Sequence, residues 1–475
     1  MTETDPAALT GDALRLFREH PHECAHVTFT APQKAVGLAL VLVAAVLLVW
    51  RPLPFLIALN AAAILFYVAH SFYKLALTWL ALSRREAELS PSKEEIAALP
   101  DEDLPRYCIL IPLYREANVL GALVESLSRL DYPQDRLDMQ LLLEEDDEDT
   151  IAAARRLALQ PPFRMVIVPN SHPKTKPKAC NHALFRATGD ILVVYDAEDR
   201  PEPDQLKKAV AAFRKLPERV VCLQAKLNYY NQRQNLLTRW FTSEYSVWFD
   251  LFLPGLHAIR APIPLGGTSN HFRLSALQEL GGWDPFNVTE DCDLGVRLHK
   301  RGYSTAVIDS TTWEEANSNL WGWVRQRSRW VKGYIQTYLV HMRRPLGLLR
   351  ALGLKDWLNF QLTIGGIIFC FLVNPIYWAM TALWFVTRWT LIYDIFPSWV
   401  FVLGTLCLVV GNFVFVYLAV AGCMKRGYYD LVKYAVLTPL YWVLMSVAGW
   451  KAALQLLSRP HYWEKTEHGL VGRHA

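Results

Sequence analysis

Long apolar stretches at both ends of the chain, with a polar region between them, constrain the fold more than any other feature of the sequence. Residues 36–50 and 55–82 are almost entirely apolar, and Arg51-Pro52 separates them. Three further apolar stretches follow the polar region, at residues 359–387, 398–423 and 434–457. A helix needs roughly 20 apolar residues to cross a bilayer of about 30 Å. The pattern predicts two membrane helices before the polar region and three or four after it.

The polar region is expected to fold as an α/β domain. Short runs rich in β-branched residues or leucine alternate with helical patterns such as residues 119–129 and 204–215. The predicted strands are residues 107–113, 139–144, 164–169, 190–195 and 220–225. This alternation is typical of a mostly parallel sheet. Ligands bind at the carboxyl ends of such strands, so motifs that directly follow a strand are the candidates for a functional site.

Charge places the α/β domain on the cytosolic side of the membrane. Basic residues flank it as Arg84, Arg85, Arg343, Arg344, Arg350 and Lys355, and the positive-inside rule associates such clusters with cytosolic segments. The net charge is only +4, and no aromatic-plus-basic pattern indicates nucleic acid. The eight cysteines contain no C-x-x-C pair, which argues against a zinc site or a disulfide framework.

The chain therefore divides into six predicted parts. They are a cytosolic N-terminal segment (1–34), two transmembrane helices (35–83), a cytosolic domain (84–342), an interfacial amphipathic segment (343–358), three or four transmembrane helices (359–457) and a C-terminal tail (458–475).

Two motifs follow the first two predicted strands. Tyr114 and Glu116 come after residues 107–113, where the alternative interpretation is a strand that simply ends in a proline turn. Residues 144–149 are six consecutive carboxylates after the second strand. Most runs of like charge are solvated loops, but the position of this run directly after a strand favours a functional role.

Asp196 and Glu198 stand one residue apart at the end of the fourth predicted strand. Carboxylates in this arrangement can share one hard cation, so that Mg²⁺ or Mn²⁺ would bridge them to a diphosphate. Lys174, Lys176 and Lys178 lie upstream. A lysine there could neutralise phosphate charge, although exposed lysines are common.

Two further motifs lie in the second half of the domain. In Thr289-Glu290-Asp291 a carboxylate could act as the general base for an acceptor hydroxyl. Gln326, Arg329 and Trp330 are spaced i, i+3 and i+4, so they share one face if the segment is helical. That face offers a guanidinium for a leaving diphosphate and an indole as a platform for a sugar ring.

In their order and spacing these motifs resemble those of glycosyltransferase family 2 polysaccharide synthases of the processive type. The sequence is similar in these motifs to cellulose and hyaluronan synthases and to the membrane transferases of bacterial exopolysaccharide gene clusters. The resemblance implies a glycosyltransferase A-type nucleotide-sugar domain in a bacterial inner membrane, with the donor site cytosolic. It implies a nucleotide-sugar donor, UDP-glucose by default, Mg²⁺ or Mn²⁺ as cofactor, and membrane lipid and export or regulatory proteins as partners.

The family's residue roles carry over position by position. Asp291 matches the base, and Asp196 and Glu198 match the metal motif. The nucleotide-sugar site is matched by Tyr114, Glu116, Glu145, Lys178 and Asp196, with Glu144 as the next choice after Glu145 for the acid of the acidic loop. The acceptor and diphosphate site is matched by Glu290, Gln326, Arg329 and Trp330. The acidic loop has Glu144-Glu145 where the family usually has two aspartates, and Asp199 beside Glu198 could also share the cation.

The resemblance implies a single inverting displacement of the nucleoside diphosphate. Polysaccharide extension with export is the first interpretation, and transfer of one sugar to a lipid is the closest alternative. A non-catalytic membrane receptor or secretion component on the same fold is the alternative from another class.

The C-terminal tail raises a question of sidedness. By resemblance, Trp463, Lys465 and Thr466 are expected to close over the bound donor, whereas an interfacial anchor is the simpler interpretation. Two spans before the domain and three after it would leave the tail on the opposite side from the donor. The tail would return to the cytosol if a break at Asn374-Pro375 divides residues 359–387 into two passes, or if another C-terminal segment re-enters the membrane. We expect the tail to be cytosolic.

Overall fold

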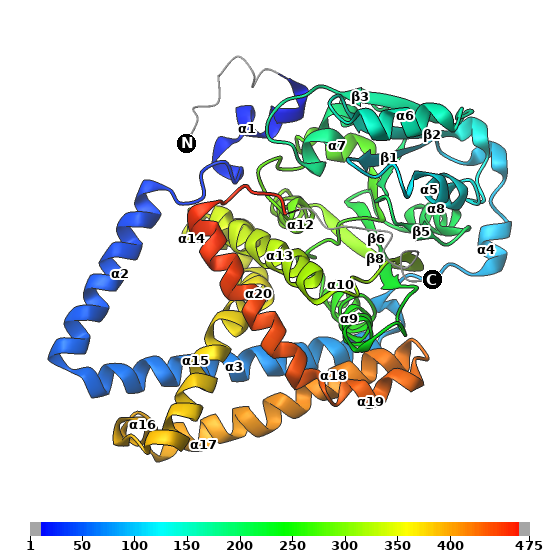
Figure 1. The fold of residues 1–475 in the computed structure, drawn as a ribbon. Coiled ribbons are helices and arrows are strands. Elements are labelled where there is room, and N and C mark those ends of the chain that lie inside the picture. Colours follow the sequence, from blue (N-terminus) through cyan, green and yellow to red (C-terminus); the bar gives the residue numbers. More distant parts are fainter. Residues whose placement is uncertain (1–10, 465–475) are drawn as a thin grey trace.

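A mixed eight-stranded sheet forms the centre of the polar region in the computed structural model, which describes residues 11–464 (Figure 1). Its strands are β1 (Tyr107–Leu113), β2 (Leu137–Glu144), β3 (Phe163–Val168), β4 (Ile191–Val194), β5 (Arg200–Pro201), β6 (Val220–Tyr229), β7 (Asn270–Arg273) and β8 (Ser304–Glu314). The order across the sheet is β3-β2-β1-β4-β7-β6-β8-β5. Four neighbouring pairs are parallel, and three, all involving β7 or β5, are antiparallel. The predicted α/β class and the five predicted strands are confirmed.

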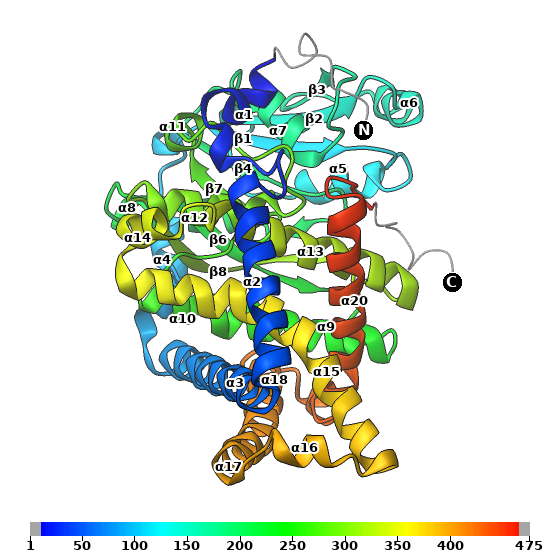
Figure 2. The ribbon, with the colours of Figure 1, turned by 90° about the vertical axis from the view of Figure 1, so that its left-hand side faces the viewer.

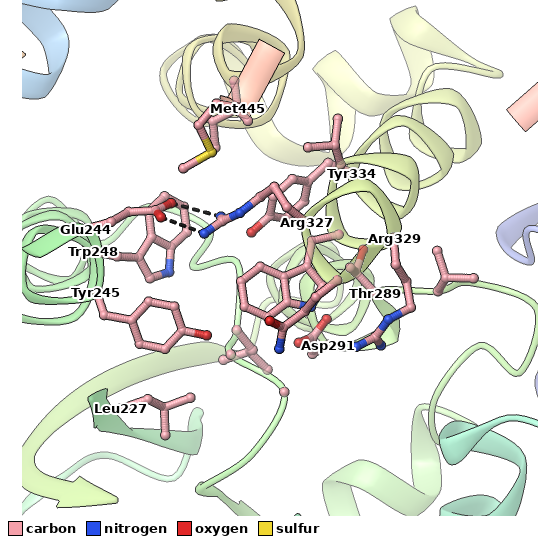
Figure 3. A pocket seen from close by; sticks show the side chains of 18 of the residues that line it. Leu227, Glu244, Tyr245, Trp248, Thr289, Asp291, Arg327, Arg329, Tyr334 and Met445 are labelled. Atoms are coloured by element: carbon pink, nitrogen blue, oxygen red, sulfur yellow. Dashed lines mark hydrogen bonds and ion pairs between the residues drawn. The ribbon is translucent and has the colours of Figure 1, made fainter. Parts of the chain in front are cut away.

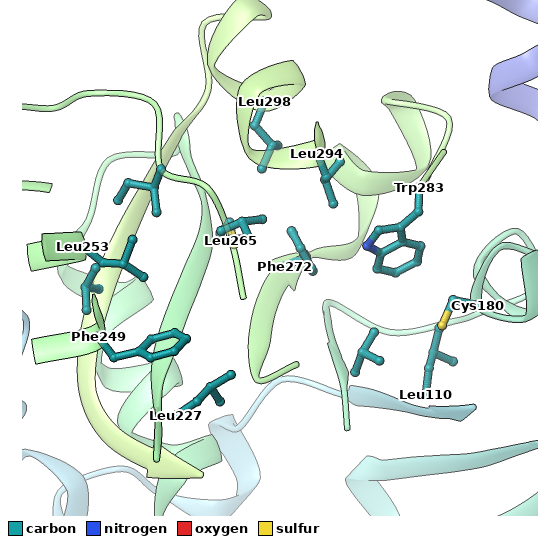
Figure 4. Close-up of a cluster of buried hydrophobic side chains, with 14 of the residues drawn as sticks. Leu110, Cys180, Leu227, Phe249, Leu253, Leu265, Phe272, Trp283, Leu294 and Leu298 are labelled. Carbon is teal, nitrogen blue, oxygen red and sulfur yellow. The ribbon is translucent and has the colours of Figure 1, made fainter. Parts of the chain in front are cut away.

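Helices cover both faces of this sheet because side chains along each strand alternate between the two faces. Cys108 and Leu110 of β1 belong to one buried cluster, with α7 (Lys176–Leu184) and α12 (Glu290–Lys300). Ile109 and Ile111 belong to the other, with α5 (Leu120–Leu127) and α8 (Gln205–Lys215). Figure 4 shows the first cluster. The remaining helices of this half are α1 (Arg15–Glu19), α4 (Lys93–Ala97), α6 (Glu148–Arg156), α9 (Leu236–Val247), α10 (Leu253–Ala258), α11 (Leu274–Glu279) and α13 (Leu320–His341).

Long apolar helices form the rest of the described chain. They are α2 (Ala31–Trp50), α3 (Pro52–Ser83), α14 (Pro345–Phe360), α15 (Gly366–Thr387), α17 (Ser398–Leu406), α18 (Asn412–Lys425) and α20 (Thr438–Ser458), with the short α16 (Thr390–Asp394) and α19 (Val432–Ala435) between them. Within the described residues, five helical segments are long and apolar enough to cross a membrane. Figures 1 and 2 both place α16 and α17 at the end of the molecule that is farthest from the sheet.

Residues 345–387 form one helical segment of 43 residues, which differs from the expectation. The segment bends at Gly353, whose φ of 74° only glycine adopts easily. Pro375 lies inside α15, so the expected break at Asn374-Pro375 is absent. The segment predicted to be interfacial, residues 343–358, falls in the first part of this helical segment and contains its bend at Gly353.

Both ends of α20 lie against the α/β domain. Just before α20, the Tyr434 carbonyl accepts a hydrogen bond of 3.0 Å from Trp240 Nε1 of α9. Just after α20, the Tyr462 carbonyl accepts one of 2.7 Å from Lys332 Nζ of α13. The helix packs along α13 between these two points. It therefore begins and ends on the domain side, although its composition alone suggests a membrane crossing.

Candidate active site

A cavity of about 980 Å³ lies at the carboxyl ends of the central strands. Tyr114 and Glu116 line it after β1, Glu144 ends β2, and Asp196 and Glu198 follow β4. Parallel strands bring their carboxyl ends to one edge of a sheet, so motifs far apart in sequence meet there. The structure thus brings together most of the predicted site residues.

The loop that carries Asp196 and Glu198 is held by Asp199. Its carboxylate is 1% exposed and accepts hydrogen bonds from the Asp196 backbone N–H, at 2.8 Å, and from the Thr268 hydroxyl. Burial raises the pKa of Asp199. Asp199 is not among the residues that line the cavity, and these contacts support the loop. Glu198 does line the cavity, and burial together with the Asp196 charge raises its pKa to about 8.

Lys176, rather than Lys178, reaches the cavity. Lys176 stands at the start of α7, where it forms an ion pair with Asp196 and donates a hydrogen bond of 2.8 Å to the Gly267 carbonyl. Burial opposes its charge, but Asp196 and Glu290 outweigh burial and raise the pKa of Lys176. Lys178 is buried and pairs with Glu144 at 2.7 Å. Lys174 also lines the cavity, and the sequence, with three lysines at a spacing of two, carried no signal that separates Lys178 from the other two.

The structure places Glu145 outside the cavity and Glu144 on its wall. Glu145 is exposed and accepts a hydrogen bond of 3.0 Å from the backbone N–H of Asn170. The choice of Glu145 over Glu144 for the nucleotide-contacting acid therefore does not agree with the geometry.

Glu290 and Asp291 open α12 at the opposite wall of the cavity. A methyl group placed on Gly267 would lie 3.4 Å from Asp291 Oδ2 and 4.0 Å from Asp196 Oδ2, so both carboxylates face the same loop. Burial raises the pKa of Asp291 to about 6. Burial and the adjacent Asp291 charge raise the pKa of Glu290 to about 8. Asp291 is therefore suited to accept a proton near neutral pH, whereas Glu290 retains its proton.

Helix α13 presents the predicted face of Gln326, Arg329 and Trp330 to the cavity (Figure 3). Gln326 Oε1, Arg329 Nε and the hydroxyl of Thr289 are buried, with no hydrogen-bond partner within residues 11–464. Buried polar atoms are normally satisfied, so these three are available to a ligand. The centre of the Trp330 ring lies 5.9 Å from the ring centre of Phe241 and 6.1 Å from that of Tyr245. This packing fixes the orientation of the indole.

Arg327, on the same helix, was not among the predicted residues. Its guanidinium forms a two-point ion pair with Glu244 of α9, at 2.8 and 2.5 Å. The Tyr441 hydroxyl of α20 donates to the same carboxylate at 2.7 Å. Figure 3 shows this pair next to Trp248 on the wall of the cavity.

The start of the C-terminal tail reaches the cavity. His461, Tyr462 and Trp463 line it, and the Trp463 ring lies 4.4 Å from the Arg329 guanidinium carbon. Trp463 is therefore placed as the gating hypothesis requires, by way of α20 and not by a second pass within residues 359–387. Lys465 and Thr466, the other predicted members of the gate, lie outside the described residues.

The cavity continues between the long apolar helices. Its lining beyond α13 comes from α3 (Tyr67, His70, Lys74, Thr78), α15 (Ile367, Cys370, Phe371, Asn374, Trp378), α18 (Asn412, Phe415, Leu418, Ala419) and α20 (Thr438, Tyr441, Trp442, Met445). One end is thus lined by carboxylates and lysines, and the other is largely apolar.

Comparisons with known proteins agree with this geometry. Residues 105–333 match the family model described as glycosyltransferase-like family 2. A probable glycosyltransferase (YdaM) from Bacillus subtilis is 28% identical over 235 residues, which is 49% of this chain and 56% of the relative. A beta-monoglucosyldiacylglycerol synthase from Synechocystis is 28% identical over 267 residues, 54% of each chain. The chain thus spans about half the length of the curated relatives it matches.

A solved structure supports the fold. The mannosyltransferase from Pyrobaculum calidifontis, in complex with GDP-Man and Mn²⁺, has a TM-score of 0.50 and 20% sequence identity. The match covers 84% of this chain and 99% of the mannosyltransferase. The predicted glycosyltransferase A-type fold is confirmed.

Proposed function

We propose that the protein transfers a sugar from a nucleoside diphosphate sugar to a lipid acceptor. The observation that carries this proposal is the single cavity that joins Asp196 and Asp291 to the space between α3, α15 and α18. A water-soluble donor fits the charged end of this cavity, and an apolar acceptor fits the other. The relative from Synechocystis is named as a synthase that glucosylates diacylglycerol, which supports a lipid acceptor over polysaccharide extension.

The donor site is assigned to residues at the charged end. Tyr114, Glu116 and Glu144 face the nucleoside, and Lys176 faces the diphosphate. Within residues 11–464 no three His, Cys, Asp or Glu side chains form a metal site by themselves. Asp196 and Glu198 nevertheless fit a Mg²⁺ or Mn²⁺ ion, because both are oxygen donors on one cavity wall and diphosphate oxygens would complete the coordination. When bound, such an ion neutralises charge on the leaving diphosphate.

Asp291 is assigned as the general base. It accepts the proton of the acceptor hydroxyl, whose oxygen forms the new bond to the anomeric carbon as the bond to the diphosphate breaks. The electron pair of the breaking bond leaves with the nucleoside diphosphate, where Arg329 stabilises the charge. One displacement inverts the anomeric centre. Glu290, protonated at neutral pH, and Gln326 orient the acceptor, and Trp330 supports the sugar ring.

Product analysis tests this function. The purified full chain in liposomes would be incubated with a panel of radiolabelled UDP- and GDP-sugars, Mn²⁺ or Mg²⁺, and diacylglycerol or phospholipid acceptors. A lipid carrying one sugar is the expected product. A polymer of many sugars would support the polysaccharide interpretation instead, and the absence of nucleotide release with every donor would support a receptor.

The raised pKa of Asp291 predicts the pH dependence of the reaction. A base with a pKa of about 6 carries a proton below that pH and cannot accept another. The value of kcat/KM should therefore fall about tenfold per pH unit below pH 6, because this parameter reports the free enzyme. An ordinary aspartate, with a pKa of about 4, would keep its activity to about pH 4. A profile measured in overlapping buffers that stays flat to pH 5 would contradict the assignment.

The contacts of α20 predict a topology with both termini and the catalytic domain in the cytosol of a bacterial cell. In this arrangement α2, α3, α15 and the α17–α18 pair cross the inner membrane, and α20 does not. In a variant without native cysteines, Ser458→Cys, at the exposed end of α20, should react with an impermeant maleimide only after the cells are permeabilised. The matched control Ser398→Cys, at the exposed start of α17, should react in intact cells. Labelling of both positions in intact cells would refute this topology.

A further inference from the structure

Lys74 is a basic residue in the middle of an otherwise apolar part of α3. It lines the cavity together with Tyr67, His70 and Thr78 of the same helix. Its ammonium lies 5.1 Å from the ring centre of Phe415 in α18 and 5.7 Å from that of Phe252, and both rings also line the cavity. The sequence motifs and the donor site leave this residue without a role.

No carboxylate among the described residues lies at ion-pair distance from the Lys74 ammonium. Across residues 11–464 no ion pair or hydrogen bond involves its ammonium. Glu244, the acidic residue on the same part of the cavity wall, is already bound to Arg327 at 2.8 Å and to the Tyr441 hydroxyl at 2.7 Å. His70 is hydrogen-bonded to the Leu362 carbonyl at 2.9 Å. The aromatic rings attract the ammonium, but they supply none of the oxygen acceptors it prefers.

An ammonium that lies within a membrane helix and faces a cavity is costly unless an anion occupies that cavity. Lys74 stands nine residues before the end of α3 at Ser83, about 13 Å along the helix at 1.5 Å per residue. The end of α3 is packed under the α/β domain, because the backbone of Leu77 touches Gly255 of α10. In the topology proposed above, Lys74 therefore lies close to the domain side, at the level where the headgroups of the cytosolic leaflet meet the acyl chains.

The cavity around Lys74 suits a lipid. Phe252 and Phe415 lie beside the ammonium, and Ile367, Leu418 and Met445 line the same cavity. Across the same cavity are Trp330 and Asp291. The acyl chains of a lipid can contact these side chains. The headgroup of such a lipid can then place an acidic group at Lys74 and a nucleophilic oxygen towards Asp291.

We infer that the acceptor is a phosphate-bearing lipid and that Lys74 binds its phosphate. The inference rests on the proposed function and specifies the class of acceptor. A neutral diacylglycerol would leave the ammonium unpaired, whereas phosphate oxygens accept its hydrogen bonds. The phosphate belongs either to a glycerophospholipid with a hydroxyl in its headgroup or to a polyprenyl phosphate.

The two sources differ in the bond that forms. With a headgroup hydroxyl, the hydroxyl oxygen attacks the anomeric carbon, Asp291 takes its proton, and the nucleoside diphosphate leaves with the electron pair of the broken bond. With a polyprenyl phosphate, an ionised phosphate oxygen attacks, the same leaving group departs, and no proton has to be removed. The first product is a glycoside that is stable to mild acid, and the second is an acid-labile sugar phosphate.

Acceptor selectivity in liposomes tests the inference. The full chain and its Lys74→Gln and Lys74→Arg variants would be assayed with diacylglycerol, phosphatidylglycerol and a polyprenyl phosphate, each at several mole fractions. We expect the wild-type protein to prefer one phosphate-bearing lipid over diacylglycerol. Lys74→Gln should raise the half-saturating mole fraction of that lipid about 10- to 100-fold, the usual cost of losing a hydrogen bond to a charged group. Lys74→Arg, which keeps the charge, should restore most of the preference.

Arg51→Gln is the matched control, because Arg51 caps the other end of α3 and does not line the cavity. This variant should keep the wild-type ratio of the transfer rate to phosphate-bearing acceptors to the transfer rate to neutral acceptors. UDP binding by each variant checks that the domain is folded. The inference would be overturned if the protein prefers diacylglycerol to both phosphate lipids and if Lys74→Gln does not change the ratio of the transfer rates to phosphate-bearing and neutral acceptors. The proposed function would remain intact in that case. The absence of any lipid-linked product would overturn the proposed function itself.

Discussion

Asp291→Asn is expected to lower kcat by about 10²- to 10⁴-fold, which is the usual contribution of a positioned general base. Asparagine has nearly the same shape as aspartate but cannot accept the proton of the acceptor hydroxyl. Donor binding should change little, because the donor site is built from Tyr114, Glu144, Lys176 and Asp196 on other elements. Release of the nucleoside diphosphate at saturating donor and acceptor measures kcat, and calorimetric titration with UDP measures donor-site affinity.

Asp135→Asn is a suitable control, since Asp135 is an exposed carboxylate in the turn before β2 and is remote from the cavity. It should retain wild-type turnover. Near-normal turnover in Asp291→Asn would exclude Asp291 as the base. A large loss in both kcat and UDP affinity would show that Asp291 acts in donor binding.

Asp196→Ala is expected to weaken metal-dependent UDP binding by about 100-fold or more. Residues that merely orient a metal ligand contribute about 10- to 100-fold, so removal of a direct ligand should cost at least as much. The change also leaves Lys176 without its ion-pair partner. The unpaired Lys176 ammonium would then attract the diphosphate even in the absence of metal. UDP titrations with and without Mn²⁺ separate the two effects.

The variant Asp196→Asn provides the second comparison. It retains one oxygen ligand and the side-chain volume, so it should lose less metal-dependent affinity than Asp196→Ala. Equal UDP affinity of the wild type and both variants, with and without Mn²⁺, would show that Asp196 holds no cation.

The sequence predicted the parallel part of the sheet well, because strands β1, β2, β3, β4 and β6 are continuous apolar runs. It did not predict β7 and β5. These have only four and two residues, and their positions depend on pairing with β4, β6 and β8 instead of on a local pattern. The same limit applies to β8 (Ser304–Glu314), where polar and apolar residues alternate irregularly and β-bulges shift the register.

For the site, the sequence predicted the positions of motifs better than the orientation of individual side chains. The order of Asp196, Asp291 and Arg329 along the chain was sufficient to assign them to one site. The choice between Glu144 and Glu145, or between Lys176 and Lys178, depends on which way one residue points at the end of a strand or the start of a helix. That orientation is decided by tertiary contacts such as the buried Lys178–Glu144 pair.

Hydropathy was also insufficient for α20. Its apolar residues resemble those of a membrane span, but one face of the helix packs against α13 and α15, whereas Leu440, Leu454 and Leu457 are exposed. Composition cannot separate a helix that is buried against protein from one that is buried in lipid. The position of Trp463 at the cavity therefore could not be derived from a count of apolar stretches.

The packing of α20 also affects how the protein folds. The catalytic face of α13 is held from behind by Arg327, whose partner Glu244 lies on α9 and is also bound by Tyr441 of α20. Removal of one partner from such a buried network leaves an uncompensated charge. Catalytic helix and C-terminal helix consequently belong to one cooperative folding unit. The part of the chain that matches the family model, residues 105–333, does not include α20. A longer part of the chain therefore has to fold before the cavity can form.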